Sequence, residues 1–261
     1  MPVDAIVTAG GIPKPGEPLY PYTRGKAKAL LEIAGRPMLQ WILDALGGAQ
    51  TIRRVVVLGL DEHDAPLRCA KTIGFLPNQG SMLGNMVAGA HWVLDQDPNS
   101  RHALMVSSDI PAITPEIVDW NVTTSLETDD EIYYSVIPQA AMEKRFPGSR
   151  RSYFKFKDGT VTAGDVNMVA TRLLTHIPPA MQALIDARKN VFQQAGLIGF
   201  DTLFKLATRQ LTLKEAEQTV SRRLKVRGRL LLCPHAEAGM DVDKPAQYEL
   251  MKRDLESRTP H

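Results

Sequence analysis

The fold is decided by the stretch Val3-Asp4-Ala5-Ile6-Val7-Thr8-Ala9-Gly10-Gly11 and by the loop that follows it, which leads to Lys28-Ala29-Leu30-Leu31. The β-branched, apolar run predicts a buried strand that ends on two glycines. Because glycine has no Cβ, the backbone of such a loop can approach a ligand closely, and its successive N–H groups can bind phosphate oxygens. Lys28 would add a positive charge to the phosphates. The stretch therefore predicts a strand that runs into a phosphate-binding loop.

The next elements predict an α/β fold. Pro37 opens a helix that runs to about Leu46, and Gly47-Gly48 is expected to stop it. Residues 54–59 read as a second buried strand, parallel to the first. Strand, helix and strand in this order, with a glycine loop after the first strand, predict a doubly wound sheet whose ligands bind at the carboxyl ends of the strands.

Farther along, apolar patterning predicts strands at 102–109, 131–138 and 230–234 and helices at 83–95 and 114–125. Asp158-Gly159 is typical of a hairpin turn between alternating residues. Residues 178–225 read as helices, with a capping box formed by Thr212 and Glu215.

The first stretch resembles the nucleotidyltransferases of the glycosyltransferase-A-like fold, which include the sugar-1-phosphate nucleotidylyltransferases and the MobA-like group. The resemblance rests on Ala9-Gly10-Gly11, Leu19-Tyr20-Pro21-Tyr22-Thr23, Lys28-Ala29-Leu30-Leu31 and Gly35-Arg36-Pro37-Met38-Leu39. It implies a three-layer α/β/α, mostly parallel, doubly wound and Rossmann-like sheet with a small β-hairpin lid. It also implies one NTP-transferase domain over residues 1–261, with the lid and acceptor region at about 139–166.

The sequence departs from the family pattern in the glycine-rich loop. Residues 12–15 lengthen this loop, and Pro18 stands where the family has a phosphate-binding arginine. We therefore expect Lys14 or Arg24 to supply the missing charge, or the triphosphate to be held differently.

The resemblance implies a nucleotide site made of Ala9, Gly10 and Gly11 with Lys28. A second segment with amide and hydroxyl groups, Gln79-Gly80-Ser81, precedes a helix, and in the family such a segment contacts the nucleobase. The alternative interpretation is that Ser81 caps the helix and binds nothing.

Two carboxylates are implied as ligands of Mg²⁺ or Mn²⁺. Asp109 follows a buried strand and precedes Ile110-Pro111, as in the family's metal-binding D-x-P. Asp243, in a stretch that resembles the family's D-[IV]-D ending, would complete the metal site, with Asp241 the weaker candidate. Each aspartate could instead serve as a helix cap.

The resemblance implies that the acceptor site lies in the region after residue 139. Arg150 and Arg151 could pair with an acceptor phosphate, and Asp165 or Asn167 would border the acceptor as a similar segment does in the family. The competing interpretation is a solvated basic hairpin.

Composition excludes several other classes of protein. With 31 basic and 29 acidic residues in 261, the near-neutral charge argues against nucleic-acid binding, and no apolar run is long enough to span a bilayer. Cys69 and Cys233 are isolated, and no leader precedes Val3, so we expect a cytoplasmic protein with buried thiols.

These features together predict a nucleotidyltransferase that joins NMP from an NTP to a phosphorylated small-molecule acceptor, with release of pyrophosphate. One alternative is a glycosyltransferase of the same fold, although Ser107-Ser108-Asp109 lacks the first acid of D-x-D. The other is a non-catalytic nucleotide sensor, which the loss of the loop arginine at Pro18 suggests. A dehydrogenase is disfavoured because no G-x-G-x-x-G leads directly into a helix. The base, the acceptor and the oligomeric state stay open.

Overall fold

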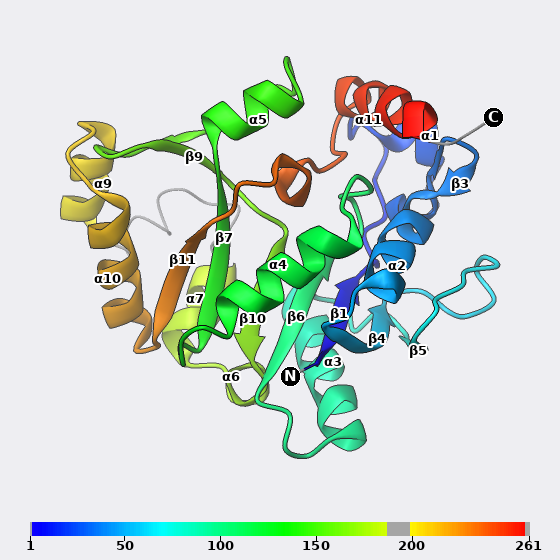
Figure 1. The fold of residues 1–261 in the computed structure, drawn as a ribbon, viewed down its shortest axis with the longest axis horizontal. Coiled ribbons are helices and arrows are strands. Elements are labelled where there is room, and N and C mark those ends of the chain that lie inside the picture. Colours follow the sequence, from blue (N-terminus) through cyan, green and yellow to red (C-terminus); the bar gives the residue numbers. More distant parts are fainter. Residues whose placement is uncertain (1, 187–198, 259–261) are drawn as a thin grey trace.

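The computed structural model describes residues 2–186 and 199–258 and shows a large central sheet with helices on both faces (Figure 1). Within these residues the strand order is β5-β4-β1-β6-β10-β7-β9-β8, and β11 also pairs with β7. The strands are β1 (Val3–Thr8), β4 (Ile52–Leu58), β5 (Thr72–Leu76), β6 (His102–Ser107), β7 (Ile132–Pro138), β8 (Phe154–Lys155), β9 (Thr160–Ala163), β10 (Val166–Ala170) and β11 (Gly228–Leu232). A separate small pair is formed by β2 (Glu32–Ile33) and β3 (Arg36–Pro37).

The first half of the sheet is parallel. β1 lies between β4 and β6, with Ile6 opposite both Val56 and Met105, and β5 continues the sheet beyond β4. β1 and β4 are buried on both faces, which explains why they read as continuous apolar runs. Their carboxyl ends meet at one edge, where the loop after Thr8 begins.

The second half of the sheet is mixed. β10 runs antiparallel to both β6 and β7, the hairpin β8–β9 extends the sheet beyond β7, and β11 runs parallel to β7. The fold class expected from the sequence is confirmed: a Rossmann-like α/β fold with a large, mostly parallel central sheet.

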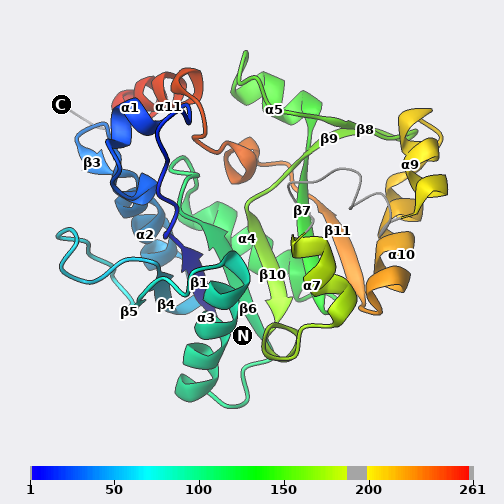
Figure 2. The ribbon, with the colours of Figure 1, turned by 180° about the vertical axis from the view of Figure 1, so that it is seen from behind.

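Helices cover both faces of the sheet. On one face lie α2 (Met38–Gly48), α4 (Pro115–Ser125) and α5 (Gln139–Arg145), while α3 (Met82–Gln96) and α7 (Pro179–Asp186) lie on the other (Figure 2). Two groups of buried apolar side chains fill the layers, one beneath α2 and α4 and one beneath α3. The remaining helices of the described residues are α1 (Tyr20–Thr23), α6 (Thr171–Thr175), α9 (Phe200–Ala207), α10 (Leu213–Leu224) and α11 (Pro245–Arg258), with short 3₁₀ turns η1 (Lys28–Leu30) and η3 (Ala236–Gly239).

α2 ends at Gly48, within the glycine pair that was expected to stop it, and Ala49 is its C-cap. A Cβ on Gly47 would lie 3.0 Å from the backbone nitrogen of Ala70, and one on Gly48 would lie 2.8 Å from the Pro115 ring. The glycines thus also allow close packing of the end of α2. Gln139–Arg145 forms α5, a helix that the sequence patterns did not predict, and its last residues overlap a basic stretch that begins at Glu143. The expected helical region 178–225 includes residues 187–198, which lie outside the described part of the chain.

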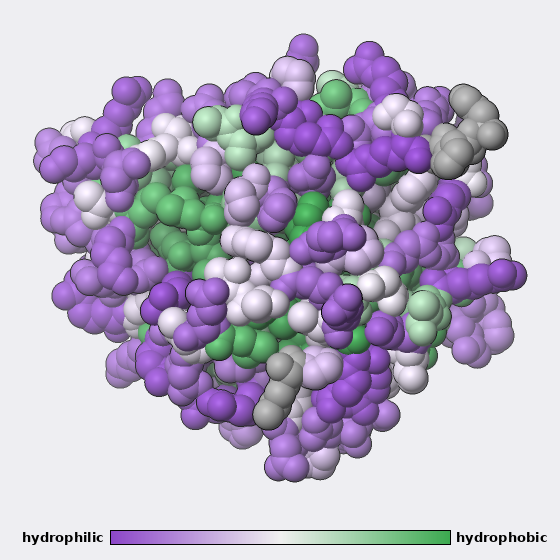
Figure 3. Space-filling view, viewed as in Figure 1, coloured by the Kyte–Doolittle hydropathy of each residue, from purple (hydrophilic) through white to green (hydrophobic). Residues whose placement is uncertain are grey.

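Apolar side chains gather in a hollow between α9 and α10 on one side and β7, β9 and β11 on the other (Figure 3). A cavity of about 500 Å³ lies there, lined by side chains such as Tyr134, Val136, Phe156 and Leu206. Among the described helices, none combines the length and the apolar character that a bilayer-spanning segment requires. Cys69 and Cys233 are free thiols; Cys233 is buried and Cys69 partly so.

Candidate active site

The glycine loop leaves β1 at the carboxyl edge of the sheet. Ala9 is buried and its N–H donates to the Leu58 carbonyl at 2.7 Å, so the loop starts beside β4. Gly10 lies against Gly59, where a Cβ would come within 2.3 Å of the Gly10 Cα atom. At Gly11, by contrast, a Cβ would meet no described atom within 4 Å. The loop is therefore packed on one side and open on the other, as a phosphate-binding loop requires.

Lys28 lies between two carboxylates that are far from it in the sequence. Its Nζ is 2.6 Å from Asp109 Oδ2 and also forms a short ion pair with Asp243 Oδ1. The lysine side chain is only 16% exposed. Although burial lowers the pKa of Lys28, the charges of Asp109 and Asp243 outweigh this effect and raise it, so the ammonium form is held firmly. The fold thus brings together the lysine and both aspartates that the sequence placed in the site.

Asp109 is held by its neighbours as well as by Lys28. The Ser107 hydroxyl donates to Asp109 Oδ1 at 2.6 Å. The Val242 N–H donates to the Asp109 carbonyl at 2.9 Å, which ties the end of β6 to the segment that carries Asp243. The backbone N–H of Asp243 donates to Gln247 Oε1 at 3.0 Å, which anchors that segment to the start of α11. Burial raises the pKa of the Asp243 carboxyl, but its contacts, those with Lys28 foremost, outweigh burial and lower the pKa, so this carboxyl is ionised.

A second ion pair joins Arg151 to Asp241. Arg151 Nη1 binds Asp241 Oδ1, and Arg151 Nη2 donates to the Ala163 carbonyl at 3.4 Å. Both side chains are nearly buried, at 11% and 14% exposed. Burial raises the pKa of Asp241 to about 6; Arg151 opposes this shift, while Asp243 and Asp109 add to it. Asp241 therefore belongs to the same electrostatic cluster as the proposed metal ligands.

Asp165 lies between β9 and β10, with its backbone held on both sides. Its N–H donates to the Ala238 carbonyl at 2.8 Å, and its own carbonyl accepts from the Ser107 N–H at 3.0 Å. Its Oδ2 atom is buried and has no hydrogen-bond partner among the described residues; the same holds for Arg151 Nε. Burial, followed by the charges of Asp109 and Asp241, raises the pKa of Asp165 well above its ordinary range.

The site carries more negative than positive groups. Asp109, Asp165, Asp241 and Asp243 interact electrostatically, and the cations that offset them are Lys28 and Arg151. Carboxylate oxygens are the donors that Mg²⁺ prefers, and the unpartnered Asp165 Oδ2 shows that the cluster is not saturated. Within the described residues no three acidic, histidine or cysteine side chains already form a metal cage. The residues fit a cation that is shared with a bound ligand, which is the usual mode for Mg²⁺ with phosphates.

Hydrogen bonds to neighbouring residues fix the conformation of the segment Gln79-Gly80-Ser81. Ser81 caps α3, since its hydroxyl accepts from the Gly84 N–H at 2.9 Å, as the alternative interpretation expected. The Gln79 N–H donates to Asn85 Oδ1 at 2.7 Å, and the Gly80 N–H donates to Asn78 Oδ1 at 2.9 Å. The segment is exposed and lies next to the glycine loop, because Asn78 Nδ2 donates to the Gly10 carbonyl at 3.3 Å.

Asn167 is also engaged within the fold. Its Oδ1 accepts from the Ser135 N–H at 2.8 Å, and its Nδ2 donates to the Gly164 carbonyl at 3.1 Å. These bonds bracket the irregular backbone at Gly164, where a Cβ would lie 2.9 Å from the Ser135 Cβ. Asn167 thus fixes the position of Asp165.

Three expected cations lie at the surface. Lys14 and Arg24 are exposed in the glycine-rich loop, and no ion pair is formed by either with a described residue; Arg24 follows α1 with a φ of 50°. Arg150 is exposed as well, with a φ of 53°, whereas its neighbour Arg151 points into the site. The structure therefore separates the two arginines that were expected to act as a pair.

Sequence reasoning missed the pairing of Arg151 with Asp241 and the role of Asn78 and Asn85. The first joins residues 90 positions apart, for which the sequence holds no local signal. The role of Asn78 did have a local signal, because Asn-x-Gly, as at Asn78 and Gly80, is typical of a turn stabilised by the asparagine side chain.

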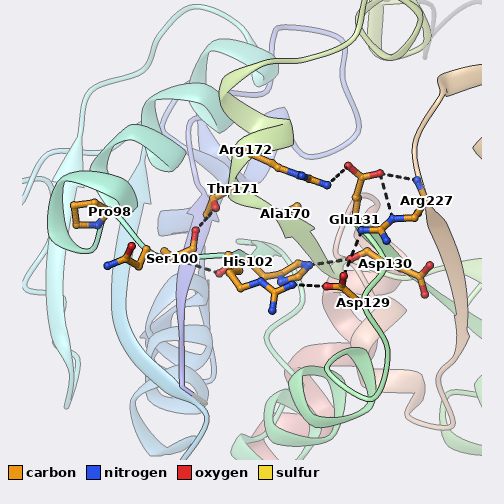
Figure 4. A pocket seen from close by; sticks show the side chains of 12 residues that line it. Pro98, Ser100, His102, Asp129, Asp130, Glu131, Ala170, Thr171, Arg172 and Arg227 are labelled. Atoms are coloured by element: carbon orange, nitrogen blue, oxygen red, sulfur yellow. Dashed lines mark hydrogen bonds and ion pairs between the residues drawn. The ribbon is translucent and has the colours of Figure 1, made fainter.

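A polar pocket of about 360 Å³ lies at the opposite end of the strands (Figure 4). It lies at the amino end of β6, beside His102. Its charges are already paired: Arg172 with Glu131 at 2.8 Å, and Arg227 with Glu131 at 3.9 Å. Ligands of such sheets bind at the carboxyl ends of the strands, so the Lys28 cluster is the better candidate.

Comparison with known proteins identifies the family of the chain. A family model described as the MobA-like NTP transferase domain matches residues 6–189. The chain is similar to a hypothetical transferase from Thermus thermophilus, with 30% identity, a TM-score of 0.81, and 95% and 100% of the two chains covered.

More distant solved structures share the fold. One is a CMP:2-keto-3-deoxy-manno-octonic acid synthetase complexed with CTP, with 13% identity, a TM-score of 0.61, and 99% and 100% of the chains covered. Another is the 2-C-methyl-D-erythritol 4-phosphate cytidylyltransferase from Thermus thermophilus, with 14% identity, a TM-score of 0.55 and the same coverage. Among curated proteins, none matches the chain significantly.

Proposed function

Because this chain belongs to the MobA-like NTP transferase family and is a nucleotidyltransferase, we propose that it transfers NMP from an NTP to a phosphorylated small-molecule acceptor and releases pyrophosphate. The observation that carries this proposal is the contact of Lys28 with both Asp109 and Asp243 beside the open glycine loop. These groups supply a cation, carboxylates and backbone N–H groups at one place, which suits phosphate chemistry.

In this proposal an acceptor phosphate oxygen attacks the α-phosphorus of the NTP and pyrophosphate leaves. The nucleophile is already anionic near neutral pH, so the protein needs no serine, cysteine or histidine nucleophile. Its residues act by positioning and by offsetting charge. The open side of Gly11 admits the phosphates, and Lys28, whose backbone N–H donates to the Gly11 carbonyl at 2.8 Å, stabilises the charge on the α-phosphoryl group.

We assign the metal-binding role to Asp109 and Asp243. Bound Mg²⁺ would offset the charge of the α-phosphate and its neighbours. Ser107 and Val242 hold Asp109 in place for this role. Without such a cation, the surplus of carboxylates in the cluster would repel a triphosphate.

The acceptor is assigned to the side of Arg151 and Asp165. Arg151 Nε is a donor and Asp165 Oδ2 is a carboxyl oxygen, and both are buried and without a partner among the described residues. Groups of this kind are costly to leave unpaired, which favours a ligand that contacts them. In this proposal the segment 139–166, with α5 and the hairpin β8–β9, forms the lid over the acceptor.

The test is a pyrophosphate-release assay with all four NTPs, Mg²⁺ and a panel of phosphorylated acceptors. CTP is the first choice of nucleotide because two structures of similar fold are named for CTP or for cytidylyl transfer. The matched control is Asp109→Asn, which removes the charge but keeps the shape; it should abolish metal-dependent release while the protein stays folded. Sugar release from an NDP-sugar without pyrophosphate release would favour a glycosyltransferase. NTP binding without any turnover would favour a nucleotide sensor.

A further inference from the structure

Lys28 and a divalent metal would compete for the same oxygens. Lys28 Nζ contacts Asp109 Oδ2 at 2.6 Å and also pairs with Asp243 Oδ1, so a single ammonium group bridges the two carboxylates assigned to Mg²⁺. Asp109 Oδ1 is meanwhile occupied by the Ser107 hydroxyl. A divalent cation placed on the same oxygens would repel the ammonium strongly, because little water screens this nearly buried lysine.

The geometry also allows the Lys28 ammonium to leave the two carboxylates while the backbone of the site stays in place. Its backbone is fixed beside the glycine loop, since its N–H donates to the Gly11 carbonyl at 2.8 Å and its carbonyl accepts from the Leu31 N–H at 3.0 Å. Its ammonium stands at the end of a flexible four-carbon chain. A phosphate at the open side of Gly11 would offer this ammonium a new anionic partner close to its own backbone.

We propose that Lys28 is a built-in counter-ion, which holds Asp109 and Asp243 together in the nucleotide-free protein and yields them to a divalent metal when the phosphates of the nucleotide arrive. The proposal rests on the metal-binding role assigned above to these two aspartates. It implies that the metal alone binds weakly, because the metal must displace Lys28 from both of its carboxylate partners before a phosphate is present to receive the ammonium. Metal and nucleotide would therefore bind together.

The experiment measures binding of Mn²⁺ alone, without any nucleotide, by the loss of its free-ion electron paramagnetic resonance signal. The variant is Lys28→Met, which keeps most of the length of the unbranched side chain and removes its charge. We expect it to bind Mn²⁺ at least about tenfold more tightly than the wild type, which corresponds to roughly 1.4 kcal/mol. The matched control is Lys26→Met, which removes the same charge from an exposed lysine two residues away and should not change Mn²⁺ affinity.

Two further measurements keep the result interpretable. Lys28→Gln, which is polar but uncharged, should reproduce the effect if Lys28→Met folds poorly. Adding Asp109→Asn to either variant should abolish the gain, because the gained site includes that carboxylate. In thermal unfolding, Mn²⁺ alone should raise the Tm of the Lys28 variants more than that of the wild type.

Unchanged Mn²⁺ affinity in both Lys28 variants would overturn the counter-ion proposal, as would an equal gain in Lys26→Met. Because the measurement uses no NTP and no turnover, it is separate from the test of the transferase. A gain in Mn²⁺ affinity in a protein that releases no pyrophosphate would support the counter-ion and count against the proposed reaction. Pyrophosphate release without a gain in Mn²⁺ affinity would support the proposed reaction and count against the counter-ion.

Discussion

Asp241 shows how the surroundings set the charge of one residue. Its pKa is raised to about 6, first by burial, with Arg151 opposing and Asp243 and Asp109 adding to the shift. In the unfolded chain an aspartate titrates near pH 3.9. The native protein therefore holds an extra proton on Asp241 between about pH 4 and pH 6.

This difference predicts a pH dependence of stability. Because native Asp241 binds more protons than unfolded Asp241 in that window, its contribution to the free energy of unfolding should fall as the pH rises from about 4 to about 6 and should then be constant. Replacing Asp241 by Asn should remove this falling contribution and make the slope of the free energy of unfolding against pH less negative, whatever it does to stability as a whole. Urea unfolding at closely spaced pH values measures both slopes. Asp165 adds a slope of the same sign in both proteins, so an identical slope in the variant would exclude Asp241 as its source.

The residues of the cluster were predictable to different degrees. Lys28, Asp109 and Asp243 each carry a local signal, since each lies at a strand end or in a motif, and the fold does bring them together. The Arg151–Asp241 pair has no such signal, because it depends on how β9 and the segment after β11 approach each other. Arg150 and Arg151 look alike in the sequence, and only the positive φ of Arg150 and the burial of Arg151 distinguish them.

At the scale of elements, the packing of the β1 loop against the end of β4 leads to a second prediction. Replacing Gly59 by Ala should destabilise the protein by about 2 kcal/mol or more, because a Cβ there would lie 2.3 Å from the Gly10 Cα atom and φ is 96°. Replacing Gly11 by Ala should leave stability almost unchanged, since its Cβ would meet open space.

The affinity for NTP should not follow stability in these two variants. In Gly11→Ala the new methyl group would point into the space assigned to the phosphates and weaken NTP binding in a fully folded protein. Urea unfolding and NTP titration on the same samples compare the two effects. Normal NTP affinity in Gly11→Ala would remove this glycine from the phosphate site.

The altered glycine-rich loop leads to a third prediction. Pro18 cannot replace the arginine of the related pattern, while Lys14 and Arg24 are exposed and form no ion pair with described residues. We expect one of them to bind the triphosphate, with Arg24 favoured because its guanidinium can bind phosphate bidentately. Replacing each by Ala, singly and together, and titrating NTP with Mg²⁺ identifies the residue. Loss of less than about tenfold in the double variant, or roughly 1.4 kcal/mol, would refute this compensation.

Among the elements, those with a strong repeating pattern or a local cap were predicted well. The Thr212–Glu215 capping box is present at the start of α10, and the Asp158-Gly159 turn joins β8 to β9. α2 ends at the expected glycine pair, with Gly48 as its last residue, but no local rule reveals that Gly47 and Gly48 also pack against Ala70 and Pro115, which are distant in the chain.

At the scale of the whole molecule, the cluster lies where the two halves of the sheet meet. The parallel half supplies the glycine loop, Lys28 and Asp109, whereas Arg151 and Asp165 come from the segments around β8, β9 and β10. β10 joins the halves by pairing with β6. If the first half binds the nucleotide and the second binds the acceptor, the two affinities should be separable by substitution.

The last prediction tests this division with Arg151. Replacing it by Ala would leave Asp241 buried without a partner, so Arg151→Lys is the better change, because it keeps the charge and loses the planar, bidentate geometry. We expect the KM for the acceptor to rise by about tenfold while the affinity for NTP stays the same, because Arg151 Nε has no partner among the described residues and is assigned in our proposal to the acceptor. Arg150→Ala is the matched control, since Arg150 is exposed and should affect neither value. Steady-state kinetics with the acceptor varied, together with NTP titration, separates the outcomes. If Arg151→Lys weakens the binding of NTP and of the acceptor equally, the two halves form one undivided site. If Arg150→Ala has the same effect as Arg151→Lys, both arginines bind the acceptor as a pair.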